Sequence, residues 1–143
     1  MSKVVSLRLK DPQIQRLERA ARRMGRTPSE TAALLLEEAL RQQEFAFIEF
    51  RDSGVGRQAH IKGSRLAVWQ LVDIVRSYDG DVETVALEFD VPATAVKAAL
   101  VFADTYPDEI EAAIADADVS FEELQRLIPN LQMTEIDLDP PSA

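Results

Sequence analysis

The stretch that most restricts the possible folds is "KVVSLRLKDP", residues 3–12. Its side chains alternate between two faces, with Val5, Leu7 and Leu9 on one and Val4, Ser6 and Arg8 on the other. This alternation predicts a half-buried β-strand. The residues that follow have a helical pattern, so the strand has no neighbouring strand in the sequence. Because an unpaired strand leaves backbone N–H and C=O groups without partners, we expect it to pair with a second copy of itself.

Two short helices are predicted after the strand. Asp11 is predicted to cap a first helix that begins at Pro12, and Gly25 is typical of a helix end. Thr27, followed by proline and then by Glu30 three positions after it, predicts a second start with a capping box. The second helix is predicted to end near Gln43.

A strand and two short helices bury too little apolar surface for a stable monomer. The second helix also carries more apolar residues than a short solvent-facing helix tolerates: Ala32, Leu35, Leu36, Ala39 and Leu40. A dimer removes both difficulties, because the strands pair antiparallel and the second helices pack across a two-fold axis. The outer face of such a ribbon fits the DNA major groove, and serine and arginine are suited to base edges.

Residues 3–43 resemble the ribbon-helix-helix repressors (CopG, Arc and MetJ type), a fold that many bacterial antitoxins use to bind DNA. The resemblance rests on the order of strand, "DP" helix start, "GRTPSE" turn and apolar second helix. It implies two sets of DNA contacts. Val4, Ser6 and Arg8 would contact bases, and Arg26, Thr27 and Ser29 would contact phosphates. The alternatives are a solvated strand face for the first set and a purely structural helix cap for the second.

Charge is divided unevenly along the chain. Residues 1–43 hold nine basic and five acidic residues, whereas the remainder holds seven basic and twenty acidic residues. Attraction to phosphate supplies most of the affinity for DNA, so only the first part has the charge that DNA binding needs. The asymmetry predicts two separate tasks, one of them facing a polyanion.

The next part of the chain, residues 44–116, is predicted to be a small helical domain with a short β-element. "FAFIEFR" and "QAHIKGSRLAV" predict a hairpin, and helical patterns follow in "VWQLVDIVRSY", "VETVALEF", "VPATAVKAALVFADTY" and "PDEIEAAIADA". Trp69 is expected as a buried anchor, and Asp81 as a helix cap. The second and third of these helices have a helix-turn-helix outline. The third, which would be the recognition helix, has only Lys97 as a basic residue, and this favours a protein-binding role over DNA binding.

Residues 45–116 resemble a small antitoxin-associated helical domain (VapB type, with a homeodomain-like helical trio) of otherwise unknown function. The resemblance rests on "GSRLAV", "VETVALEF" and "AVKAALVFADTYPDEI". It implies that the partner is a PIN-like ribonuclease toxin, which the chain would neutralise.

Residues 117–143 are predicted to be an acidic tail that becomes ordered on a partner. "SFEELQRLI" predicts an amphipathic helix capped by Ser120, and "LQMTEIDLDPP" alternates apolar and acidic residues. The candidate toxin-binding residues are Phe121, Leu124, Leu131, Met133, Ile136, Asp137, Leu138 and Asp139. The alternative is a solvated tail or a strap that packs on its own domain.

Several function classes are disfavoured. The chain has no cysteine and one histidine, His60, so we expect no disulfide, no metal site and no cofactor. No nucleophile motif or phosphate-binding loop accompanies the candidate polar residues, which are therefore expected to be structural rather than catalytic: His60, Arg65, Asp108, Glu109 and Glu111. No apolar run reaches membrane-span length, no secretory signal is recognised, and the cytoplasm is the expected compartment.

The sequence thus predicts a mainly α protein with three parts: a ribbon-helix-helix dimer (1–43), a small helical domain (44–116) and an acidic tail (117–143). The expected function is that of an antitoxin and autorepressor. It would bind double-stranded operator DNA as a homodimer or higher oligomer and neutralise a PIN-like ribonuclease, with no membrane partner. The alternatives are a stand-alone repressor, whose second domain serves oligomerisation or ligand sensing, and a plain oligomeric adaptor.

Overall fold

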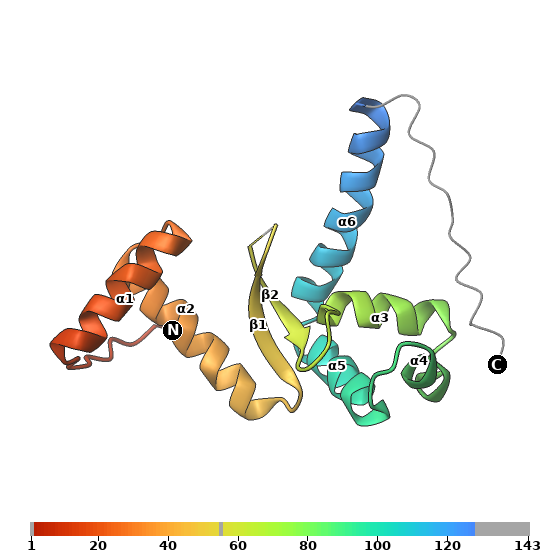
Figure 1. Cartoon of the computed structure of the whole chain (residues 1–143), viewed down its shortest axis with the longest axis horizontal. Helices are drawn as coiled ribbons and strands as arrows, with labels where there is room; N and C mark the ends of the chain where they lie inside the picture. The colour runs from red at the N-terminus through yellow and green to blue at the C-terminus, as the bar shows by residue number, and fades with distance from the viewer. Residues whose placement is uncertain (1, 55, 128–143) are drawn as a thin grey trace. The chain divides into compact units, whose positions relative to one another are not determined.

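The computed structural model describes residues 2–54 and 56–127, with the backbone alone at 119–122, 124, 125 and 127. The described chain is mainly helical and contains a small two-stranded antiparallel sheet (Figure 1). It divides into two compact units between Glu44 and Phe45, named here unit 1 and unit 2. The elements are α1 (Asp11–Met24), α2 (Pro28–Glu44), β1 (Ile48–Ser53), β2 (Gly56–Ile61), α3 (Val68–Ser77), α4 (Val82–Glu88), α5 (Ala93–Thr105) and α6 (Pro107–Leu127).

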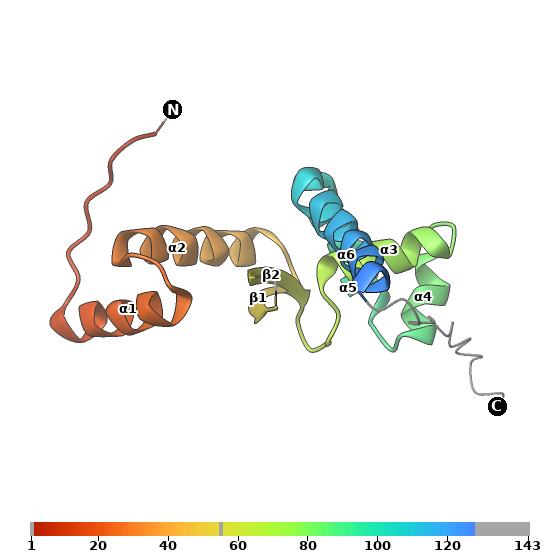
Figure 2. The same cartoon turned by 90° about the horizontal axis from the view of Figure 1, so that it is seen from above.

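Unit 1 is a helical hairpin in which α1 and α2 lie alongside each other (Figure 2). The predicted cap at Asp11 is wrong by one residue. Lys10 has the extended backbone of a cap, and its N–H donates to Oε1 of Gln13 at 2.9 Å. Asp11 is instead the first helical residue, where its carboxylate still interacts favourably with the helix dipole.

The turn between the two helices follows the sequence closely. Gly25 has the left-handed conformation, with φ at +64°, and ends α1 as predicted. Oγ1 of Thr27 accepts the N–H of Glu30 at 3.2 Å, which confirms Thr27 as the cap of α2. The second helix ends at Glu44, one residue beyond the predicted end at Gln43.

Residues 2–10 form neither helix nor strand in the single chain, and every one of them is exposed. Val4 is 96% exposed, Val5 79% and Leu7 72%, which is unusual for three apolar side chains so close together. A single chain offers no second copy of this segment, so the pairing of the strand stays a prediction.

Unit 2 begins with the predicted hairpin. Strands β1 and β2 pair antiparallel, with Ile48 opposite Ile61 and Ser53 opposite Gly56. The first strand is shorter than predicted, because residues 45–47 form a turn in which Phe47 has a φ of +64°. The apolar alternation that begins at Phe45 therefore does not mark the start of the strand.

The core of unit 2 lies among the hairpin, α3, α4, α5 and α6. Its largest fully buried side chains are Ile61, Val68, Leu71, Val85, Val96 and Phe102. On α3 the buried residues recur at helical spacing, so one face of this helix is directed into the core. Asp81 caps α4 as predicted, since its Oδ1 accepts the N–H of Thr84 at 3.2 Å.

The last helix is longer than predicted. A separate helix capped by Ser120 was expected, but α6 continues through this position to Leu127. The reason is local: after Pro107 at its start, α6 contains no glycine or proline and is rich in alanine and glutamate, which favour a continuous helix. Among the helices of the described residues, none has the length and apolarity of a membrane span.

Candidate functional site

The candidate base-contacting residues lie together in the exposed N-terminal segment. Val4, Ser6 and Arg8 are all exposed in the single chain, as a surface that reads DNA requires. The segment ends where α1 begins, so the extended Lys10 and the first turn of α1 hold its C-terminal end.

The other side chains of this segment help to form a groove in unit 1. This groove, named here the unit 1 groove, has a volume of about 870 Å³. Its apolar lining comes from the N-terminal segment and from both helices: Leu7, Leu9, Leu17, Ala20, Ala32 and Leu35. Four arginines of α1 also line it, namely Arg16, Arg19, Arg22 and Arg23. The groove thus combines an apolar surface with basic side chains.

The candidate phosphate-contacting residues are brought together at the start of α2. Arg26, Thr27 and Ser29 are exposed there, directly after the left-handed Gly25. The N-terminus of a helix carries a partial positive charge, which favours an anion at this position. The Thr27 hydroxyl also has a structural task, because it caps α2.

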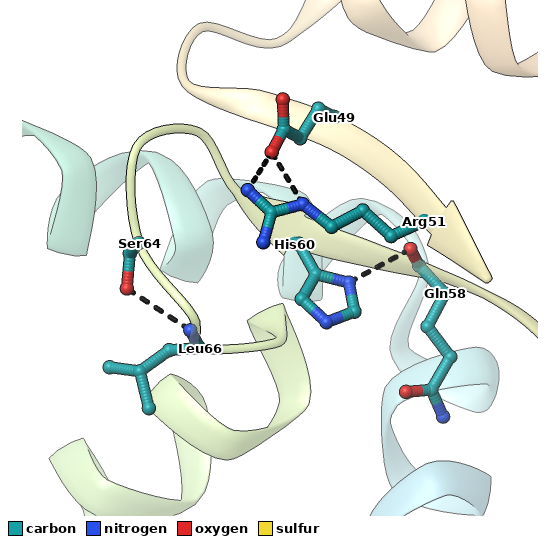
Figure 3. A network of polar contacts seen from close by, with 6 residues as sticks. All are labelled: Glu49, Arg51, Gln58, His60, Ser64 and Leu66. Carbon is teal, nitrogen blue, oxygen red and sulfur yellow. Dashed lines mark hydrogen bonds and ion pairs between the residues drawn. The ribbon is translucent and has the colours of Figure 1, made fainter. Parts of the chain in front are cut away.

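A second polar cluster lies on one face of the hairpin in unit 2 (Figure 3). Glu49 pairs with His60 across the sheet, and Arg51 pairs with Gln58. The guanidinium of Arg51 donates to the Glu49 carboxylate, with Nε 2.6 Å from Oε1. Nδ1 of His60 lies 3.1 Å from the backbone oxygen of Gln58, which gives this ring a structural partner. Among the described residues, no group of three or more His, Cys, Asp or Glu side chains is placed to hold a metal ion.

The "GSRLAV" motif forms the connection from β2 to α3. Gly63 has a φ of +80°, and Oγ of Ser64 accepts the N–H of Leu66 at 3.1 Å (Figure 3). The N–H of Ile61 closes the turn by donating to the carbonyl of Leu66 at 3.0 Å. Arg65 was expected to be structural, but it is exposed and donates no hydrogen bond to any described residue. The motif is therefore a turn whose arginine faces solvent.

A small pocket in unit 2 was not predicted. It has a volume of about 220 Å³ and lies between β2, α3 and α6. Trp69 lines it together with Arg57, Gln58, Ala59, Glu109, Ile110, Ala112, Ala113 and Asp116; we name it the Trp69 pocket. The prediction that Trp69 is a buried anchor is wrong in degree, because the side chain is half-buried and borders this opening. Two features of the sequence could have indicated the pocket. The chain has a single, large tryptophan side chain, and its last helix carries many small alanine side chains that leave space beside a large ring.

Among the described residues of unit 2, two carboxylates have a lowered pKa because each accepts a hydrogen bond from another side chain. The hydrogen bond from Arg76 lowers the pKa of Glu111 and ties α3 to α6. The hydroxyl of Thr84 lowers the pKa of Asp81 at the start of α4. Asp108 and Glu109 lie in the first turn of α6, where acidic residues interact favourably with the helix dipole. Asp81, Asp108 and Glu109 therefore stabilise the starts of their own helices, and Glu111 joins α6 to α3.

The candidate toxin-binding residues fall largely outside the described part of the chain. Leu131, Met133, Ile136, Asp137, Leu138 and Asp139 lie beyond residue 127, and for Phe121 and Leu124 only the backbone in α6 is described. Their role stays a prediction.

The chain is similar to one known family over part of its length. The family model described as a protein of unknown function (DUF433) matches residues 48–103. The match begins with β1 and ends within α5, so it covers the hairpin, α3 and α4 but neither unit 1 nor α6. Comparison with curated proteins and with solved structures gave no match.

Proposed function

We propose that this chain is the antitoxin of a type II toxin–antitoxin system. It binds its own operator as a homodimer or higher oligomer, and it neutralises a PIN-like ribonuclease toxin through residues 117–143. The observation that carries the proposal is the exposure of the whole N-terminal segment of unit 1, in whose sequence Val5, Leu7 and Leu9 alternate with Val4, Ser6 and Arg8.

Dimerisation is supported by the apolar surface that unit 1 leaves uncovered. Leu7 and Leu9 line the unit 1 groove, and Leu36 and Leu40 on α2 are 55% and 46% exposed. An apolar patch of this kind is typical of an interface. In a two-stranded ribbon, Val5, Leu7 and Leu9 of each copy would face the helices, and the backbone groups of the segment would gain partners.

DNA binding is supported by charge and by position. If Leu7 faces the helices of the dimer, the strand period of two places Ser6 and Arg8 on the opposite face. A two-stranded ribbon fits the major groove, where arginine donates to guanine and serine to several bases. The excess of basic residues in residues 1–43 supplies the attraction to phosphate.

The test of the DNA-binding half is binding to a duplex from just upstream of the gene, measured by fluorescence anisotropy across a series of salt concentrations. We expect specific binding that weakens steeply with salt, and a loss of about tenfold or more in affinity for Arg8→Ala. Arg65→Ala is the matched control, because Arg65 is also an exposed arginine without a hydrogen bond to a described residue. Equal affinity for the upstream duplex and for an unrelated duplex would overturn this half of the proposal.

The test of the toxin-binding half is co-expression with a PIN-like ribonuclease encoded beside this gene. The full chain should restore growth, and a chain that ends at Leu127 should not, although it keeps every element that the structure describes. Growth restored equally by the shortened chain would remove the tail from the proposed mechanism.

A further inference from the structure

We infer that the Trp69 pocket is an anchor site for one apolar side chain, preferably aromatic, from a basic segment of a protein partner. The inference depends on one part of the proposed function, namely that unit 2 binds a protein partner. It concerns a surface other than residues 117–143, and it draws on residues of β2, α3 and α6.

The lining of the pocket suits an apolar side chain. Ala59, Ala113 and Ile110 contribute small or apolar surface, and Trp69 contributes an aromatic ring. Nε1 of Trp69 donates to Oε1 of Gln58 at 3.3 Å, so the polar atom of the indole is already satisfied within the chain. An occupant therefore gains contact with the ring without competing for its hydrogen bond.

The size of the pocket favours a single side chain over a cofactor or metabolite. Small-molecule sites usually have volumes of about 300–1,000 Å³. The Trp69 pocket, at about 220 Å³, is smaller than that range. Protein interfaces commonly place one buried aromatic or arginine anchor in a pocket of this kind, surrounded by contacts of lesser energy.

The charge around the pocket selects a basic partner. From Pro107 to Asp118, α6 carries five acidic residues and no basic one: Asp108, Glu109, Glu111, Asp116 and Asp118. Glu109 and Asp116 both line the pocket, and their spacing of about two helical turns places them on one face of α6. Arg57 also lines the pocket and forms an ion pair with Asp52, with 3.3 Å between Nη1 and Oδ1. Arg57, Glu109 and Asp116 each make a further interaction within the chain, so the partner is selected by the net charge of the lining, which is −1 from two carboxylates and one guanidinium. A segment with basic residues on both sides of its anchor complements this surface.

The experiment uses Trp69 itself as the reporter, because it is the only tryptophan of the chain. The full chain is titrated with three synthetic pentapeptides, and tryptophan emission is recorded under selective excitation. The first has a central phenylalanine between basic residues, the second replaces this phenylalanine by alanine, and the third places it between acidic residues. We expect a saturable shift with the first peptide, affinity weaker by about tenfold with the second, and no binding of the third.

Two pairs of variants locate the binding. Ala112 is exposed and lines the pocket, so Ala112→Phe should fill the pocket with a ring. Ala115 is exposed on α6 but does not line the pocket, so Ala115→Phe is the control. The first variant should lose about tenfold or more in affinity for the phenylalanine peptide, and the second should match the wild type. Glu109→Gln should weaken binding, whereas Asp108→Asn, its neighbour outside the pocket, should change it less. Far-UV circular dichroism of each variant checks that the fold is retained.

Equal shifts with the first two peptides, or a shift that Ala112→Phe leaves unchanged, would overturn the inference. Emission that changes with protein concentration alone would show that a second copy occupies the pocket, which also overturns it. Ala112→Phe is then tested in the co-expression assay. Full neutralisation by this variant would overturn the inference and leave the proposed function intact. If neither the wild type nor any variant restores growth in the presence of the ribonuclease, the proposed function is overturned. The peptide titration would still show whether the Trp69 pocket binds an apolar side chain.

Discussion

The rings of Phe45 and Phe102 meet edge to face, with their centroids 5.2 Å apart. Tyr106 joins them at 4.9 Å from Phe102 and 5.8 Å from Phe45. The two pairs that Phe45 makes are edge to face, and such pairs add to the stability gained from burial alone. The first residue of unit 2 is therefore held by the end of α5, although α2 ends only one residue before it.

This cluster predicts a large effect of Phe102→Ala. Phe102 is fully buried, so its truncation removes both the ring contacts and the filling of the core. We expect the free energy of unfolding of unit 2 to fall by about 3–5 kcal/mol. Urea denaturation followed by Trp69 emission measures it. Val101→Ala is the control, because Val101 is the 56% exposed neighbour of Phe102 and should change stability by no more than about 0.5 kcal/mol. Equal effects of the two variants would contradict the assigned core.

A second prediction concerns the turn of unit 1. At Gly25 the φ of +64° is unfavourable for any residue with a Cβ, although an added Cβ would have no atom within 4 Å. Gly25→Ala should thus destabilise unit 1 by about 1 kcal/mol through backbone strain alone. Gly54 also has open space around it, and its φ lies outside the left-handed region, so Gly54→Ala should be nearly neutral. Thermal unfolding followed by circular dichroism compares the two, and an equal loss in both would contradict the assignment.

A third prediction concerns pH. The Asp81 carboxylate accepts the N–H of Thr84 at 3.2 Å and its hydroxyl at 2.6 Å, and the hydroxyl is the larger cause of its lowered pKa. A lowered pKa means that folding favours the charged form. The stabilisation is therefore complete above the pKa of the unfolded chain, at about 4, and is lost as pH falls through the folded value.

Asp81→Ala should accordingly lower the melting temperature near neutral pH, and the difference from the wild type should shrink on acidification below about pH 4. Melting curves over this range measure the effect. Val101→Ala, which changes an exposed side chain of α5 without removing an ionisable group, should show no such dependence. A difference for Asp81→Ala that stays constant down to strongly acidic pH would show that the carboxylate charge plays no part.

A fourth prediction separates the two faces of the N-terminal segment. In the proposed dimer, Leu7 faces the helices and Ser6 faces DNA. Leu7→Asp should therefore weaken dimerisation by about tenfold or more, because it would bury a charge at the interface. Ser6→Asp should leave dimerisation unchanged and weaken DNA binding by repulsion from phosphate. Sedimentation equilibrium measures the first effect and anisotropy the second. A Leu7→Asp chain that dimerises like the wild type would exclude the proposed ribbon.

Much of the secondary structure could be predicted from the sequence. Gly25, Thr27 and Asp81 were predicted in their observed roles because a cap depends on a side chain and on backbone groups a few residues away. The hairpin was predicted for the same reason, since its two strands are separated by a short turn. Two predictions from local patterns were wrong. The apolar alternation at residues 45–47 predicted strand, but these residues form a turn. Ser120 was predicted to cap a new helix, but α6 continues through it.

The sequence by itself determined the local elements of this protein and the division of charge between its parts, because both follow from residues that are near one another in the chain. Only the tertiary structure decided that Phe45 packs against Phe102, and that Trp69 shares a pocket with Arg57 and Glu109. These contacts join residues of separate elements. They arise from the packing of helices and strands against a common core, which no spacing within a single element can specify.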